Sequence, residues 1–145
     1  MAPNLAVLAH IALDPGDVWR THSLDEHLLG VGTLAAEFAT PFRASEWARA
    51  SAYLHDLGKN GGDFQAYLNG ASGYDPEAHL EGKPGRVDHS SAGAVWAREH
   101  WEAVGIFLGY LVAGHHAGLP DWQGGLAGLE ARSRQQERLE MAMAG

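Results

Sequence analysis

The sequence predicts an all-α fold, a helical bundle that forms a single domain over residues 1–145. Apolar residues recur at helical spacing in several segments, and glycine or proline separates these segments from one another. No segment shows the alternating pattern that is typical of a half-buried β-strand. Hydrophobic residues make up 46% of the chain, which is enough for a packed core.

The first predicted helix begins at Ser23 and ends before Pro41, because proline cannot continue a helix. Ser23 and Glu26 form a capping-box pattern at its start. A second helix is predicted over 45–57, with Ser45 at its N-cap. The core-facing stripe of this second helix consists of Trp47, Ala50, Leu54 and Leu57.

The rest of the chain is predicted to hold four further helices and one long loop. A short helix covers 63–68, and a loop without periodicity covers 70–87. Helices follow at 88–103 and 105–115, and a polar helix covers 126–143. Five aromatic residues at helical spacing are expected in the core: Trp47, Trp96, Trp101, Phe107 and Tyr110.

The composition argues against several classes of function. Ten Lys and Arg against eighteen Asp and Glu give a net charge of −8, which disfavours nucleic-acid binding through a broad basic face. The absence of cysteine excludes disulfide scaffolds, thiolate zinc sites and cysteine nucleophiles. No segment reaches the roughly 18 apolar residues of a membrane span. The N-terminus also lacks the pattern of a signal peptide, so we expect a cytoplasmic protein with no membrane partner.

Nine histidines are the most distinctive feature of the composition. The dipeptide His55-Asp56, near the end of a predicted helix, can present a ring nitrogen and a carboxylate oxygen to one cation. A carboxylate can also bridge two cations. An isolated pair of this kind is more often a surface feature. His115 and His116 follow an apolar helix, where two polar rings need either a metal or solvent as a partner.

Two further histidines lie in predicted helices. His27 is on the core-facing side of the first helix, where the alternative to a ligand is a hydrogen-bonded core histidine. His89 opens another helix, where the alternative is a capping or surface residue. Together the histidines come from four separate helices or helix ends, which is how helical bundles build metal sites. The zinc-peptidase motif HExxH and the phosphate-binding loop of nucleotide-driven motors are both missing.

Taken together, these motifs resemble the HD superfamily of metal-dependent phosphohydrolases. More narrowly, they are similar to the HD nuclease domain of the CRISPR-associated helicase-nuclease from type I systems. The resemblance covers most of the chain, from Trp19 to Trp122, and the ordered set of motifs is more specific than an HD pair alone. The matching runs are Thr21 to Leu28, Leu54 to Lys59, Phe64 to Leu68, Asp88 to Ala94 and Gly114 to Asp121.

The resemblance implies a metal site between facing helices of an HD-domain bundle. It makes His27, His55 and Asp56 ligands of one metal. It makes His89, His115 and His116 ligands of a second metal, with Asp56 bridging the two. Lys59 would act with Asp56 in catalysis by facing phosphate, whereas His22 either supports the ligands or the substrate side or is simply exposed. The implied cofactors are one or two divalent transition metal ions, namely Mn, Ni, Co or Fe, with Mg or Zn as further options.

The chain departs from the family pattern in one respect. Family members close the first metal site with a further aspartate well downstream of the paired histidines. Asp121 belongs to the GLPD run and is not that residue, and the tail offers no acid in a matching motif. Either the chain is C-terminally truncated or its first metal site is incomplete.

The resemblance implies a nuclease that hydrolyses phosphodiester bonds of single-stranded DNA in antiviral CRISPR interference, as an endonuclease or exonuclease. Its partners would be a CRISPR-associated helicase and the crRNA-guided surveillance complex. The net charge of −8 is the strongest objection, and it weakens if the helicase feeds single strands and the metals supply positive charge. The alternatives are an HD phosphohydrolase acting on nucleotides, an inactive HD-like module that docks on the helicase or surveillance complex, and a metal-free bundle with incidental histidines.

Overall fold

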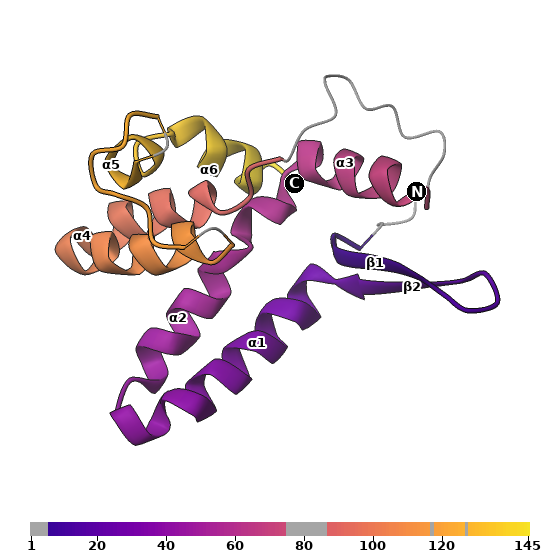
Figure 1. Cartoon of the computed structure of the whole chain (residues 1–145), viewed down its shortest axis with the longest axis horizontal. Helices are drawn as coiled ribbons and strands as arrows, with labels where there is room; N and C mark the ends of the chain where they lie inside the picture. The colour runs from indigo at the N-terminus through magenta and orange to yellow at the C-terminus, as the bar shows by residue number, and fades with distance from the viewer. Residues whose placement is uncertain (1–5, 75–86, 117, 127) are drawn as a thin grey trace.

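The computed structural model describes residues 6–74, 87–116, 118–126 and 128–145, and most of them are helical (Figure 1). The predicted helical bundle is therefore confirmed. Residues 75–86, most of the loop predicted at 70–87, lie outside the described residues. The elements are β1 (Leu8–Asp14), β2 (Val18–Ser23), α1 (Leu24–Ala39), η1 (Thr40–Phe42), α2 (Ser45–His55), η2 (Leu57–Asn60), α3 (Gly62–Ser72), α4 (Ser91–Gly114), α5 (Leu129–Arg132) and α6 (Gln136–Met143), where η denotes a 3-10 helix.

The expectation that the chain contains no strand is wrong, because β1 and β2 form an antiparallel hairpin before the first helix. Its turn lies at Gly16 and Asp17, which both have positive φ angles. Nearly all of β2 is exposed, so its residues show no alternation between polar and apolar that would reveal a strand. The hairpin projects from the helical body, beside α3 (Figure 1).

α1 and α2 form the first pair of packed helices, joined by η1. The predicted N-cap of α1 is confirmed, since the Ser23 hydroxyl accepts a hydrogen bond from the Glu26 backbone N–H. The predicted N-cap of α2 is wrong: Ala44 occupies that position, and the Ser45 hydroxyl donates instead to the Ala36 carbonyl of α1, at 2.9 Å. This bond ties the start of α2 to the end of α1.

α2 ends at His55 rather than at the predicted Leu57, and the chain continues through Asp56 into η2. The Lys59 backbone N–H donates to the Asp56 carbonyl within this tighter turn. α3 starts one residue before the prediction and runs to Ser72. The change from α-helix to 3-10 helix at Asp56 turns this carboxylate and Lys59 into the interior, where both are buried.

α4 doubles back on itself at Glu102, which has non-helical φ and ψ angles of 46° and −118°. The break predicted between the helices at 88–103 and 105–115 therefore exists, displaced by a residue or two. The two arms pack closely because small residues meet between them, such as Gly109 against Ala94. This folding back brings the two ends of α4 side by side, and His89 and His115 flank those ends.

The tail forms two short helices, α5 and α6, instead of the single helix predicted over 126–143. Leu129 and Leu139 are buried, and the Asn60 side chain donates to the Ala142 carbonyl, which ties α6 to η2. One core cluster joins α2 to both arms of α4, through Leu54, Ala97, Leu108 and Val112. No helix among the described residues is both long and apolar enough to cross a bilayer.

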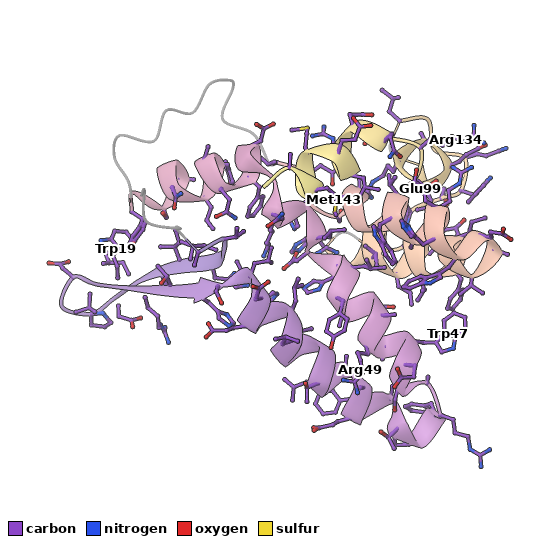
Figure 2. The ribbon with its side chains drawn as sticks, turned by 180° about the vertical axis from the view of Figure 1, so that it is seen from behind. Trp19, Trp47, Arg49, Glu99, Arg134 and Met143 are labelled. Atoms are coloured by element: carbon purple, nitrogen blue, oxygen red, sulfur yellow. The ribbon has the colours of Figure 1, made fainter. Side chains whose placement is uncertain are left out.

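Three of the five aromatic residues predicted in the core are on the surface. Trp47, Trp101 and Phe107 are 44%, 37% and 57% exposed, whereas Trp96 and Tyr110 pack against core clusters as predicted. Figure 2 shows Trp47 at the margin of the molecule, and its ring contacts that of Phe107 across α2 and α4. The spacing identified an apolar face correctly, but no described element covers that part of it.

Candidate metal centre

The centre of the site is Asp56, whose residue surface is 2% exposed. Its oxygen Oδ2 lies 3.0 Å from Nε2 of His27 and 3.1 Å from Nε2 of His55. Its other oxygen, Oδ1, lies 3.5 Å from Nε2 of both His89 and His115. The two oxygens therefore face two different sets of imidazoles.

The residues predicted as metal ligands all come together here, and they divide into two groups. The first ligand group is His27 and His55 with Asp56 Oδ2. The second ligand group is His89, His115 and His116 with Asp56 Oδ1, whose ligand atoms can all face one cation. Asp56 is the single carboxylate of the two groups within the described residues. The residues of the first group come from α1 and the end of α2, and the histidines of the second lie just outside the two ends of α4.

Backbone carbonyls orient three of these imidazoles. Nδ1 of His55 lies 2.5 Å from the Ala52 carbonyl, and Nδ1 of His115 lies 2.6 Å from the Val112 carbonyl. Nδ1 of His89 lies 3.2 Å from the Val87 carbonyl. Because a carbonyl can only accept, each Nδ1 carries the proton, and in a neutral ring Nε2 then presents its lone pair to the cluster. This is the arrangement that orients histidine ligands in metal sites.

Two pairs of imidazole nitrogens lie within hydrogen-bond distance: Nε2 of His89 and Nε2 of His116 are 2.8 Å apart, and those of His27 and His55 are 3.2 Å apart. Asp56 Oδ1 and His115 Nε2 are both buried without a hydrogen-bond partner among the described residues. A buried carboxylate oxygen that faces imidazole lone pairs is unfavourable unless a cation lies between them. The donor set therefore fits a divalent metal.

The protonation equilibria of Asp56 and His89 favour ligation as well. Burial raises the pKa of Asp56, but the neighbouring His115, His55 and Lys59 side chains outweigh burial and hold this pKa well below its usual range. Burial also lowers the pKa of His89, which favours its neutral ring. His55 differs, because the Asp56 carboxylate and the Ala52 carbonyl outweigh the effect of burial and raise its pKa, which favours the protonated ring. Asp56 is thus an anion at the centre of a set of imidazoles.

The family model of the Cas3 HD domain matches residues 13–144. The chain belongs to this family. The predicted relationship to the CRISPR-associated helicase-nuclease is therefore confirmed. Membership makes the chain an HD-type, metal-dependent hydrolase domain of the nuclease kind, which is associated with the Cas3 helicase and the CRISPR machinery. No curated protein matches the chain.

Lys59 lies inside this HD domain rather than at its surface, with 5% of the residue exposed. Its ammonium group is 2.8 Å from Asp56 Oδ2 and donates to the Ala9 carbonyl of β1 at 3.3 Å. The same ammonium lies over the ring of Phe64. Lys59 therefore neutralises the carboxylate of the first ligand group, and its predicted contact with phosphate stays a prediction.

His10 is a residue that the sequence analysis missed. It lies on β1, its ring centroid is 4.7 Å from that of His27, and its ligand atom lies within 4.8 Å of those of His27 and Asp56. His22, for which two roles were left open, pairs with His10 across the hairpin and is exposed, with its ring 5.5 Å from that of His27. Only the register of the unpredicted hairpin could have revealed His10.

A second missed residue, Arg132 of α5, supports the second ligand group. Its guanidinium donates to the Ser90 and Ser91 hydroxyls and to the Ala113 carbonyl. Asp88 accepts bonds from the backbone and hydroxyl groups of the same two serines. These contacts fix the chain just before α4 and the turn that precedes His115, which are the segments that carry the second ligand group.

Two cavities adjoin the centre. The larger, about 650 Å³, runs between α1, α2 and α4 and is mostly apolar, with Trp47 and Phe107 on its walls and His55 and His115 at one end. The smaller, about 190 Å³, is lined by His89, His116, Ser90 and Arg132 among others. Both ligand groups can therefore be reached by a molecule larger than water.

Proposed function

We propose that the chain is a metal-dependent nuclease that hydrolyses phosphodiester bonds of single-stranded DNA in CRISPR interference, together with a helicase partner in the cytoplasm. The observation that carries the proposal is the placement of the buried Asp56 carboxylate, whose two oxygens face two separate sets of imidazoles. A bridging carboxylate of this kind is what a pair of hydrolytic cations requires.

In this proposal His27, His55 and Asp56 hold one ion, and His89, His115 and His116 hold the other with Asp56. When bound, divalent ions polarise a phosphate and lower the pKa of a coordinated water. Nitrogen and oxygen donors suit Mn, Fe, Co and Ni, and also Zn and Mg. Lys59 balances the charge of Asp56 and adds positive charge next to the place where the phosphate oxygens become more negative.

The larger cavity supports a single-stranded substrate. A base stacked on an aromatic side chain contributes about 1–3 kcal/mol, and only an unpaired base can reach such a ring. Trp47 and Phe107 offer exposed rings on the wall of a cavity that ends at His55 and His115. Arg43 also lines this cavity and supplies a positive group.

A partner is needed because the charge of −8 gives the chain little attraction for DNA of its own. A helicase that delivers a single strand removes the need for a basic binding face. Large apolar side chains are exposed along α1 and η1, at Leu29, Leu34, Phe38 and Phe42. Because exposed apolar patches often mark protein contacts, we propose this surface as the docking side for the helicase or the crRNA-guided surveillance complex.

The decisive experiment uses circular single-stranded DNA, which only an endonuclease can open, together with a linear strand that also reports exonuclease activity. We expect cleavage with Mn²⁺, Ni²⁺ or Co²⁺, and a loss of more than about 100-fold in both His55→Ala and Asp56→Ala, because each change removes a metal ligand. His100→Ala is the matched control, since His100 is an exposed histidine whose Nδ1 bonds to the Trp96 carbonyl.

Two other outcomes would replace the proposal. Release of phosphate from nucleotides without cleavage of either DNA would favour a nucleotide phosphohydrolase. A chain that takes up no metal and cleaves nothing would favour a docking module, for which the exposed apolar surface of α1 and η1 is the supporting observation.

A further inference from the structure

We propose that His10 is an additional ligand of the first metal ion, and that it turns the first ligand group into a nitrogen-rich site. The inference rests on the proposed two-metal function. Its basis is that ligand atoms of His10, His27 and Asp56 lie within 4.8 Å of one another, although His10 is 17 positions before His27 and on a different element. The family match begins at residue 13, so it gives His10 no role.

The backbone next to His10 is held firmly against the site. The Gln65 side chain of α3 accepts from the Leu8 N–H at 3.0 Å and donates to the Leu8 carbonyl at 2.8 Å. Gln65 also lies 2.7 Å from the Lys59 carbonyl, to which it donates. The carbonyl of Ala9, which is 1% exposed, accepts from the Lys59 ammonium. Two successive residues before His10 are therefore fixed to α3 and η2.

The direction of the His10 side chain follows from a register shift in the hairpin. The pairing of β1 with β2 is irregular between Leu8 and His10, and such bulges re-aim the side chains that follow them. Ala9 is buried, and the His10 ring meets His27 edge to face. His22, opposite His10 in the register, stacks at a centroid distance of 6.2 Å but lies in neither group of potential ligands. The geometry thus places His10 among the potential ligands of the first metal ion and leaves the neighbouring His22 outside them.

The first ligand group needs such a donor. Without His10 it offers two imidazoles and Asp56 Oδ2, and this oxygen is already paired with the Lys59 ammonium at 2.8 Å. An imidazole adds a ligand without adding charge. With His10, the first ligand group would offer three imidazole nitrogens and one carboxylate oxygen, Asp56 Oδ2. Nitrogen-rich sites favour Co²⁺, Ni²⁺ and Zn²⁺ over Mg²⁺, which prefers oxygen donors.

The test is a titration of the full chain with Co²⁺, followed by its visible absorption bands and by the metal content after equilibrium dialysis. We expect two bound ions in the native chain. His10→Ala should weaken one of them by at least about 10- to 100-fold, because the loss of a ligand costs no less than the loss of its support, and should leave the other unchanged. His22→Ala is the matched control and should bind both ions like the native chain.

Two further variants secure the interpretation. His10→Gln keeps a polar side chain of similar length. It tests whether His10 binds the first ion if His10→Ala does not fold. His10→Asp replaces the nitrogen donor by oxygen, so it should lower the preference of this ion for Co²⁺ over Mg²⁺. Unchanged binding of both Co²⁺ ions in His10→Ala or His10→Gln would overturn the proposal for His10 and leave the nuclease intact. A native chain that binds no metal would instead overturn the proposed function itself.

Discussion

The two ligand groups share one carboxylate but differ in what competes for it. In the first ligand group, Asp56 Oδ2 is within 3.1 Å of two imidazoles and is also paired with the Lys59 ammonium. In the second, Asp56 Oδ1 has no hydrogen-bond partner among the described residues. A cation that binds the first group is repelled by the Lys59 ammonium. A cation that binds the second group meets Asp56 Oδ1, which no hydrogen bond from the described residues compensates.

The supports of the two groups differ as well. His89 of the second group is flanked by Asp88 and Ser90, which belong to the network that Arg132 ties to the Ala113 carbonyl. The first group lies beside the hairpin, a two-stranded unit that is largely exposed. Two ligand groups that share one carboxylate can therefore be unequal sites, and we expect the second ligand group to bind its ion more tightly.

The expected difference in affinity between the two ligand groups is tested most directly by removing one imidazole from each group. We expect His89→Ala to weaken the tighter of the two bound Mn²⁺ ions by more than about 100-fold, because a ligand is lost and not only its support. His27→Ala should weaken only the looser ion. The Mn²⁺ affinities of both variants are measured by titration, in which electron paramagnetic resonance detects the free Mn²⁺. The order of affinities is wrong if His27→Ala removes the tighter ion.

A smaller effect is expected from Gly58, which joins the two groups. Its backbone N–H donates to the His89 carbonyl at 3.0 Å, and a Cβ at this position would collide with that same backbone. Gly58→Ala should therefore lower the free energy of unfolding by about 2–3 kcal/mol and weaken the second ion more than the first. The measurements are urea unfolding and Mn²⁺ titration.

Gly62→Ala is the matched control for Gly58→Ala. A Cβ at Gly62 meets nothing within 4 Å, and the residue starts α3, where alanine is a better helix former. We expect equal or slightly higher stability and unchanged metal binding. If the two glycine variants behave alike, the close approach of Gly58 to His89 does not couple the groups.

The residues that gather around Asp56 were expected from the sequence because they stand in short motifs that resemble those of the family. The pairs His55-Asp56 and His115-His116 are adjacent in the chain, and His27 and His89 stand in motifs of the expected order. Helical periodicity also predicted the break within α4, although the structure shows that this break folds the chain back on itself. Short-range motifs were therefore sufficient to place these residues together, whereas their role as ligands stays a prediction.

The rest of the site depends on contacts that no local pattern encodes. His10 was missed because an exposed strand has no alternation, and its nearness to His27 follows from the hairpin. Arg132 lay in a tail that was predicted to be one solvated helix, yet its guanidinium reaches hydroxyls 41 and 42 positions away in the chain. Trp47 was predicted in the core because spacing identifies an apolar face but not whether another element covers it.

The smallest expected effect concerns Arg132, which lies behind the second ligand group and also lines the cavity beside His116. Arg132→Gln removes charged hydrogen bonds to Ser90, Ser91 and the Ala113 carbonyl, so we expect a loss of about 1–3 kcal/mol in stability. The second ion should weaken by about 10-fold and the first should not change. Arg134→Gln is the control, because Arg134 forms an exposed pair with Glu130. If metal affinity stays intact while the KM for DNA rises, Arg132 instead contacts the substrate through the cavity, and the difference between the two ligand groups lies in Lys59 alone.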